Sequence, residues 1–102
     1  MSKRKVKIQE LPEFDMADYL DSDEAVAEYL TQVLADNDPG ELARALGHIA
    51  KARGMAQIAI AAGMGRESLY KALRPDAHPR FDTIQRVCAA LGVRLVAEPM
   101  PH

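Results

Sequence analysis

Residues 55–74, MAQIAIAAGMGRESLYKALR, restrict the possible folds more than any other part of the chain. The pattern predicts two short helices, 55–62 and 66–74, with Gly63-Met64-Gly65 as the turn between them. The first helix must end with a positive φ at Gly63, a conformation that glycine adopts without a Cβ penalty. This spacing predicts a helix-turn-helix, and an αα-hairpin with no nucleic-acid role is the simpler alternative.

Three side chains suit the close crossing of these two helices. Ala59 is small enough to lie at the crossing point, and Met64 and Leu69 are placed to fill the space between the helices. An Ala, a Gly four residues later and a Leu six residues after that are typical of a DNA-binding helix-turn-helix. The stretch is therefore a candidate nucleic-acid-binding element.

The charges are divided by position along the chain. The formal net charge is −2, which is unusual for a protein that binds DNA. Residues 1–9 carry four positive charges, residues 10–41 carry eleven acids and no Lys or Arg, and residues 42–102 carry nine Lys and Arg against four acids. The basic part can face phosphates, whereas the acidic part would be repelled by DNA and must point elsewhere.

The length and composition favour a single, mainly helical domain. A chain of 102 residues can bury a modest core, and its few aromatic residues and many helix formers favour helices. We divide it into an N-terminal arm and helix, 1–36, and a helix-turn-helix domain with a C-terminal strand, 37–102, packed as one globular unit. The single cysteine, Cys88, excludes an intrachain disulfide and is expected to be a buried small hydrophobe.

A capping pattern marks a helix in the acidic part. Either Asp21 or Ser22 can cap a helix that ends near Ala35, and Glu24 would complete a capping box with Asp21. Apolar residues at helical spacing give this helix one face for the core. That predicted stripe consists of Val26, Tyr29, Leu30, Val33 and Leu34.

Two more helices flank the central stretch. Asp38 and Pro39 provide a cap and a first helical residue for a helix that ends at about Arg53. Asp82 is expected to cap the last helix, which Gly92 ends.

Residues 93–98, VRLVAE, read as a short strand. Because a single strand is not stable alone, it would pair with residues 5–9, with its copy in a dimer or with another protein.

The residues argue against an enzyme and against a bound cofactor or metal. The three histidines, at positions 48, 78 and 102, lack metal-ligand spacing, and Cys88 has no evident activating partner. No glycine-rich phosphate loop follows a strand. We therefore expect no small-molecule substrate. No apolar run is long enough for a membrane span and no signal peptide is evident, so we expect a cytoplasmic protein.

The geometry of a recognition helix assigns candidate DNA contacts. Its first turn and the residue one turn later meet base edges, which nominates Arg66, Glu67 and Lys71. Arg66 can donate to guanine O6 and N7, while Glu67 can either accept from cytosine or complement the helix dipole. The full set of candidates is Gln57, Arg66, Glu67, Ser68, Tyr70, Lys71, Arg74 and Arg80.

The run GMGRESLYKALRPDAHPRFDTIQRVCAALGVRL resembles the addiction-module antidote proteins, the HigA-like antitoxins with a lambda-repressor-like helix-turn-helix. The segment FDMADYLDSDEAVAEYL is similar to their N-terminal region, and the resemblance covers about residues 14–97. Two positions depart from such repressors. Met55 stands where many have a Gln that contacts phosphate, and Gly65 stands where a Ser or Thr usually caps the recognition helix.

The resemblance implies a mainly α, lambda-repressor-like domain of about five helices with a short C-terminal strand and an acidic arm. It implies an antitoxin of a type II toxin–antitoxin module, which binds a basic RelE/ParE-type mRNA-interferase toxin. As a homodimer, such a protein binds a palindromic operator and represses its own operon. The acidic arm would then cover the RNA-binding surface of the toxin.

The toxin contacts that this function suggests combine apolar anchors with acids. They are Phe14, Tyr19, Leu20, Asp21, Asp23, Glu24 and Glu28. The apolar residues of the arm could instead pack on the domain itself. Two other functions stay open: a stand-alone phage-type repressor whose arm serves only dimerisation, and an interaction module that does not bind DNA.

Overall fold

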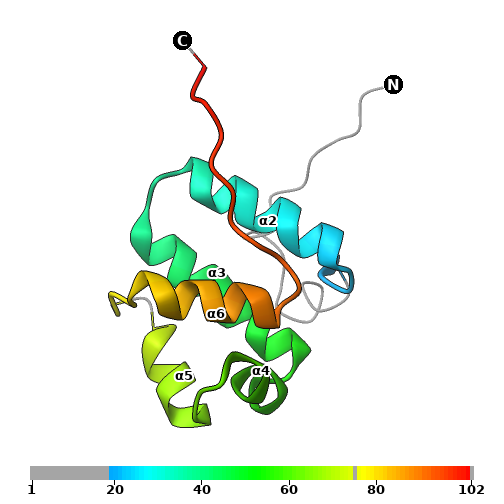
Figure 1. Ribbon diagram of the computed structural model, residues 1–102, viewed down its shortest axis with the longest axis vertical. Helices are drawn as coiled ribbons and strands as arrows, with labels where there is room; N and C mark the ends of the chain where they lie inside the picture. The colour runs from blue at the N-terminus through cyan, green and yellow to red at the C-terminus, as the bar shows by residue number, and fades with distance from the viewer. Residues whose placement is uncertain (1–18, 75, 102) are drawn as a thin grey trace.

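The computed structural model describes residues 19–74 and 76–101, and within these it contains five helices and no strand (Figure 1). Helix α2 is Asp23–Ala35, α3 is Pro39–Arg53, α4 is Met55–Ala62, α5 is Arg66–Ala72 and α6 is Phe81–Ala90. The predicted mainly helical class is confirmed, and the arrangement fits the helix-turn-helix class. The proposed strand 5–9 and the candidate residue Phe14 lie outside the described residues.

Side-chain caps fix the starts of α2 and α3. The Ser22 hydroxyl accepts a hydrogen bond from the Ala25 amide at 3.1 Å, which selects Ser22 over Asp21 as the cap. The Asp38 carboxylate accepts from the Gly40 amide at 3.0 Å, as predicted. These bonds satisfy amide groups that have no partner inside their helices.

The turn between α4 and α5 has the geometry that the sequence predicts. Gly63 has φ +70°, and its amide donates to Ile60 O at 3.0 Å. The Met64 amide donates to Ala59 O at 2.9 Å, which completes a Schellman motif. Ala59 and Leu69 are buried and Met64 packs against the core, so the two helices cross closely.

Helix α6 begins earlier than predicted. Arg80 occupies the N-cap position without a side-chain hydrogen bond, so the predicted cap at Asp82 is wrong. The Asp82 carboxylate instead accepts from the adjacent Thr83 amide at 2.9 Å, inside the first helical turn. Helix α5 is also shorter than predicted, because it ends at Ala72 and Leu73 takes the C-cap position.

One hydrophobic core joins α2 to the other helices. Helix α2 packs on α3, and α4 packs on α3, α5 and α6. The largest side chains of this core are Leu20, Tyr29, Leu46, Ile49, Leu69 and Leu91, each at most 1% exposed. Cys88 is buried among them, as predicted.

The buried stripe of α2 is narrower than predicted. Val26, Tyr29, Leu30 and Val33 are buried, but Leu34 is 41% exposed, so its assignment to the core is wrong. Among the described helices α3 makes the main contact with α2, and Leu34 instead lines the open space between α2 and residues 93–101. Arg53, at the end of α3, ties down the start of α2: its Nε lies 3.4 Å from Leu20 O.

The predicted strand 93–98 is absent among the described residues, and this part of the prediction is wrong. After α6 the chain turns at Gly92, with φ +86°, where an added Cβ would lie 2.7 Å from Asp23 Oδ2. It then continues as an extended segment over α2 (Figure 1). Val93 and Leu95 pack against the core while Arg94 and Val96 are exposed. The alternation therefore reflects an extended chain lying on a helix.

Candidate nucleic-acid interface and acidic face

Helices α4 and α5 and the loop after them carry all eight candidate DNA contacts, and all eight are exposed. Gln57 lies in the first turn of α4, Arg80 lies directly before α6, and the others lie on α5 or just after it. Helix α5 turns Leu69 into the core, because α4 packs against it there. The opposite, polar side is left to solvent, where it can meet a nucleic acid.

Two of these candidates contact each other on α5. The guanidinium carbon of Arg66 lies 5.7 Å from the centre of the Tyr70 ring. This is within the range of a cation–π interaction, which holds a side chain in one direction at an exposed site. Arg80 has a weaker partner, since its Nε lies 3.5 Å from Asp82 Oδ1 and both side chains are largely exposed.

A shallow pocket of about 200 Å³ between α3 and α5 shows two cations that the sequence reasoning missed. Arg44 and Lys51 on α3 line it together with Tyr70 and Arg74. Arg44 is paired with Glu41, with 2.6 Å between Arg44 Nη1 and Glu41 Oε1, so it is Lys51 that extends the positive surface from α5 onto α3. Positions 44, 48 and 51 follow helical spacing, which was the signal in the sequence, but only the packing of α3 on its neighbours shows which way that face points.

Helix α2 presents an acidic surface. Asp21, Asp23, Glu24 and Glu28 are exposed, as expected for contacts with a basic partner. Tyr19 is 42% exposed, whereas Leu20 is 1% exposed and lies in the core. Asp23 also faces Arg53, whose Nη2 lies 3.5 Å from Asp23 Oδ1. Of the toxin contacts that the sequence predicts, the four acids and Tyr19 are therefore exposed, whereas Leu20 is buried in the core.

Two buried groups have shifted proton affinities. Burial raises the pKa of the Cys88 thiol, so this side chain is a poor nucleophile. Burial, and then the charge of Glu41, raise the pKa of Tyr29, while Arg44 acts in the opposite direction. The Cys88 thiol and the Tyr29 hydroxyl are therefore uncharged in the core at neutral pH.

The described residues hold no group of three or more His, Cys, Asp or Glu side chains that could bind a metal ion. Within the same part of the chain, no helix is long and apolar enough to cross a lipid bilayer.

Comparisons with known proteins identify the family. The family described as "probable addiction module antidote protein" matches residues 10–99. An uncharacterised protein of Haemophilus influenzae is 42% identical over 86 residues, which cover 84% of this chain and 89% of that protein. No solved structure matches the chain. The matched region includes all of α2 to α6 and most of the segment that follows. This protein therefore belongs to the family of probable addiction module antidote proteins.

Proposed function

We propose that this protein is the antitoxin of a type II toxin–antitoxin module. It neutralises a basic RelE/ParE-type mRNA-interferase toxin by direct binding. As a homodimer it binds a palindromic operator and represses its own operon. The observation that carries the proposal is the separation of two oppositely charged surfaces on one small core, in a chain that belongs to an antidote family.

The DNA-binding half of the proposal is supported by the exposed side of α5. Arg66, Lys71 and Arg74 are exposed there, and Lys51 extends the positive surface onto α3. Cations on the recognition helix can reach base edges, while cations beside it can meet phosphates. Two-fold symmetry would double these contacts on a palindrome.

The toxin-binding half is supported by the charge of α2 and its flanks. Residues 19–41 contain seven acids and no Lys or Arg. A toxin that grips RNA needs a positive surface, and an acidic face competes with RNA for that surface. DNA would repel the same face, so the two partners would be sorted to different sides of the molecule.

A titration of labelled DNA tests the DNA-binding half. The full chain is added to its own upstream region and to a scrambled duplex of equal length. The proposal predicts tighter binding to the upstream region, and affinity for both duplexes that falls as salt rises, because bound cations release counterions. Equal affinity for the two duplexes at every salt concentration would exclude an operator-specific repressor.

Co-expression with the product of the adjacent gene, followed by pull-down, tests the toxin-binding half. Glu28→Lys reverses one exposed charge on α2, and Asp76→Lys makes the same change in the loop before α6. We expect Glu28→Lys alone to weaken the complex, mainly by slowing association. A wild-type chain that captures no product of the adjacent gene would favour the stand-alone phage-type repressor.

A further inference from the structure

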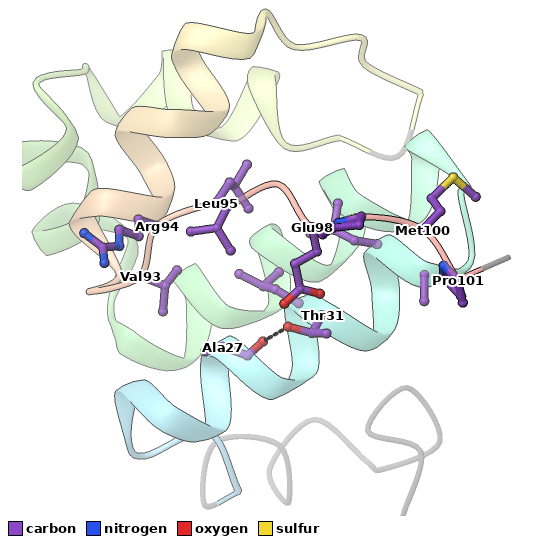
Figure 2. Close-up of a pocket in the computed structure, with 13 residues that line it drawn as sticks. Ala27, Thr31, Val93, Arg94, Leu95, Glu98, Met100 and Pro101 are labelled. Carbon is purple, nitrogen blue, oxygen red and sulfur yellow. Dashed lines mark hydrogen bonds between the residues drawn. The ribbon is translucent and has the colours of Figure 1, made fainter.

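An open groove lies between α2 and the C-terminal segment. Its volume is about 440 Å³. One wall comes from α2, with Ala27, Thr31 and Leu34 (Figure 2). The other wall comes from the extended segment, with Leu95, Val96 and Met100. None of the toxin contacts predicted from the sequence lines this groove, because all of them precede residue 29.

The groove offers apolar surface that the fold itself leaves uncovered. Leu34 is 41% exposed, Val96 is 69% exposed and Met100 is 78% exposed. The Thr31 hydroxyl donates to Ala27 O at 2.8 Å within α2, so it is engaged inside the helix (Figure 2). Exposed apolar side chains that gather along one groove are typical of a protein-binding site.

The C-terminal segment is also extended. Within residues 19–74 and 76–101, no backbone hydrogen bond involves residues 94–101. An extended chain with unpaired amide and carbonyl groups can add a strand from a partner. The groove therefore combines apolar contacts with a backbone edge.

The charges beside the groove indicate which kind of partner it suits. Glu24 and Glu28 lie one helical turn before Ala27 and Thr31 on the exposed side of α2, and Glu98 points across the groove toward Thr31 (Figure 2). Among the described residues that line the groove, Arg94 is the one cation and Glu98 the one acid, so the excess of acids comes from Glu24 and Glu28 beside it. An excess of acids beside an apolar groove suits a basic segment that carries apolar side chains.

From this charge complementarity we infer that the groove between α2 and residues 93–101 binds an extended, basic and apolar segment of the toxin. The inference rests on the proposed function and extends it, because it moves the centre of the toxin site from the start of α2 to its C-terminal half. The acids of α2 steer the toxin, and Leu34, Val96 and Met100 supply the contacts that hold it.

A groove variant tests this inference. Leu34→Gln, Val96→Gln and Met100→Gln are combined in the full chain, and affinity for the purified product of the adjacent gene is measured at physiological salt. The matched control is Ile60→Gln, which changes a 79% exposed apolar side chain on α4, away from the groove. We expect the triple variant to lose roughly tenfold or more in affinity and the control to bind as the wild type does.

Three outcomes would contradict the inference or the proposed function. A triple variant that binds the toxin as tightly as the wild type would overturn the inference while leaving the antitoxin function intact. If it keeps toxin affinity but loses self-association by light scattering, the groove belongs to a second copy of this chain, which also overturns the inference. A wild type that binds no toxin would instead overturn the proposed function.

Hydroxyl-radical footprinting of the wild-type chain gives a readout that does not depend on variants. Oxidation of Met100 is compared with and without the purified toxin. We expect protection of Met100 in the complex and an unchanged rate at Ile60. An unchanged rate at Met100 in a formed complex would show that the toxin binds elsewhere.

Discussion

The guanidinium of Arg66 lies over the ring of Tyr70, with 5.7 Å from its carbon to the ring centre. The two residues are one turn apart on α5, so the helix itself sets their distance. An exposed cation–π contact contributes about 0.5–1 kcal/mol, which favours this orientation of Arg66 at the start of the proposed recognition helix. A restrained side chain loses less freedom on binding, which favours a specific contact.

Arg66→Ala should weaken binding to the operator by about 1–3 kcal/mol and relax the preference at one base position. The physical reason is the loss of a forked donor that can pair with guanine O6 and N7. Titrations against operator variants with one base pair changed at a time check this. Arg66→Lys is the control, since it keeps the charge and removes the fork. Equal losses on operator and random DNA would show that Arg66 contacts only phosphate.

Lys51→Ala should weaken binding to operator and random DNA by the same factor. Lys51 lines the pocket between α3 and α5 and lies off the recognition helix, so we expect it to meet phosphate. Removing one phosphate contact should reduce the slope of log affinity against log salt by about 1. Affinities at several salt concentrations measure that slope. A loss restricted to the operator would contradict this role.

Leu30→Ala and Leu34→Ala should differ strongly, although they remove the same atoms from the same helix. Leu30 is 2% exposed and packs in the core, so its loss should cost about 2–5 kcal/mol of unfolding free energy. Leu34 is 41% exposed, and its loss should cost less than about 1 kcal/mol. Urea unfolding measures both values. Similar small costs for the two variants would mean that α2 is detachable from the domain.

The same substitution at two glycines of the turn should have opposite effects. Gly63 has φ +70°, so Gly63→Ser should cost about 1–2 kcal/mol although no atom lies within 4 Å of the added Cβ. Gly65 has φ −71° at the N-cap of α5 without a side-chain cap, and Gly65→Ser should stabilise by about 0.5 kcal/mol. Thermal unfolding of both variants checks the two signs.

Stability should fall in alkaline solution. Burial raises the pKa of Cys88 above its ordinary 9.0 and that of Tyr29 above its ordinary 10.0. Above each ordinary value the unfolded chain loses a proton that the folded chain keeps, so the free energy of unfolding decreases with rising pH. Well below pH 9.0 both groups are protonated in the folded and in the unfolded chain, so neither contributes a pH dependence.

Urea midpoints measured from about pH 7 to about pH 11 test this expectation. Cys88→Ala should move the onset of the loss from near 9.0 to near 10.0, where Tyr29 begins to act. An unchanged onset in this variant would show that the thiol titrates in the same way in the folded and unfolded chains.

Helix positions were predictable because local chemistry sets them. The hydroxyl of Ser22, the carboxylate of Asp38 and the positive φ of Gly63 act within a few residues of the helix ends that they fix. The error at α6 has the same origin. Asp82 suits an N-cap by residue type, but its carboxylate bonds to the next amide and the helix begins before it.

Features that depend on neighbouring elements were not predictable from the pattern. Leu34 continues the apolar stripe of α2, yet it is 41% exposed and lines the groove beside the C-terminal segment. The alternation of Val93 and Leu95 is the same in a strand and in an extended chain that lies on a helix. Lys51 joins the positive surface only because of the way α3 packs beside α5.

The shared core of α2 and α3 to α6 has a consequence for the lifetime of the protein in a cell. Leu20 and Tyr29 are buried among side chains of the other helices, so we expect the acidic face and the basic surface to unfold together. A protease that attacks the unfolded chain therefore destroys both surfaces at the same rate. If the proposed function holds, one unfolding equilibrium would then set both the rate at which the toxin is released and the rate at which the operator is released.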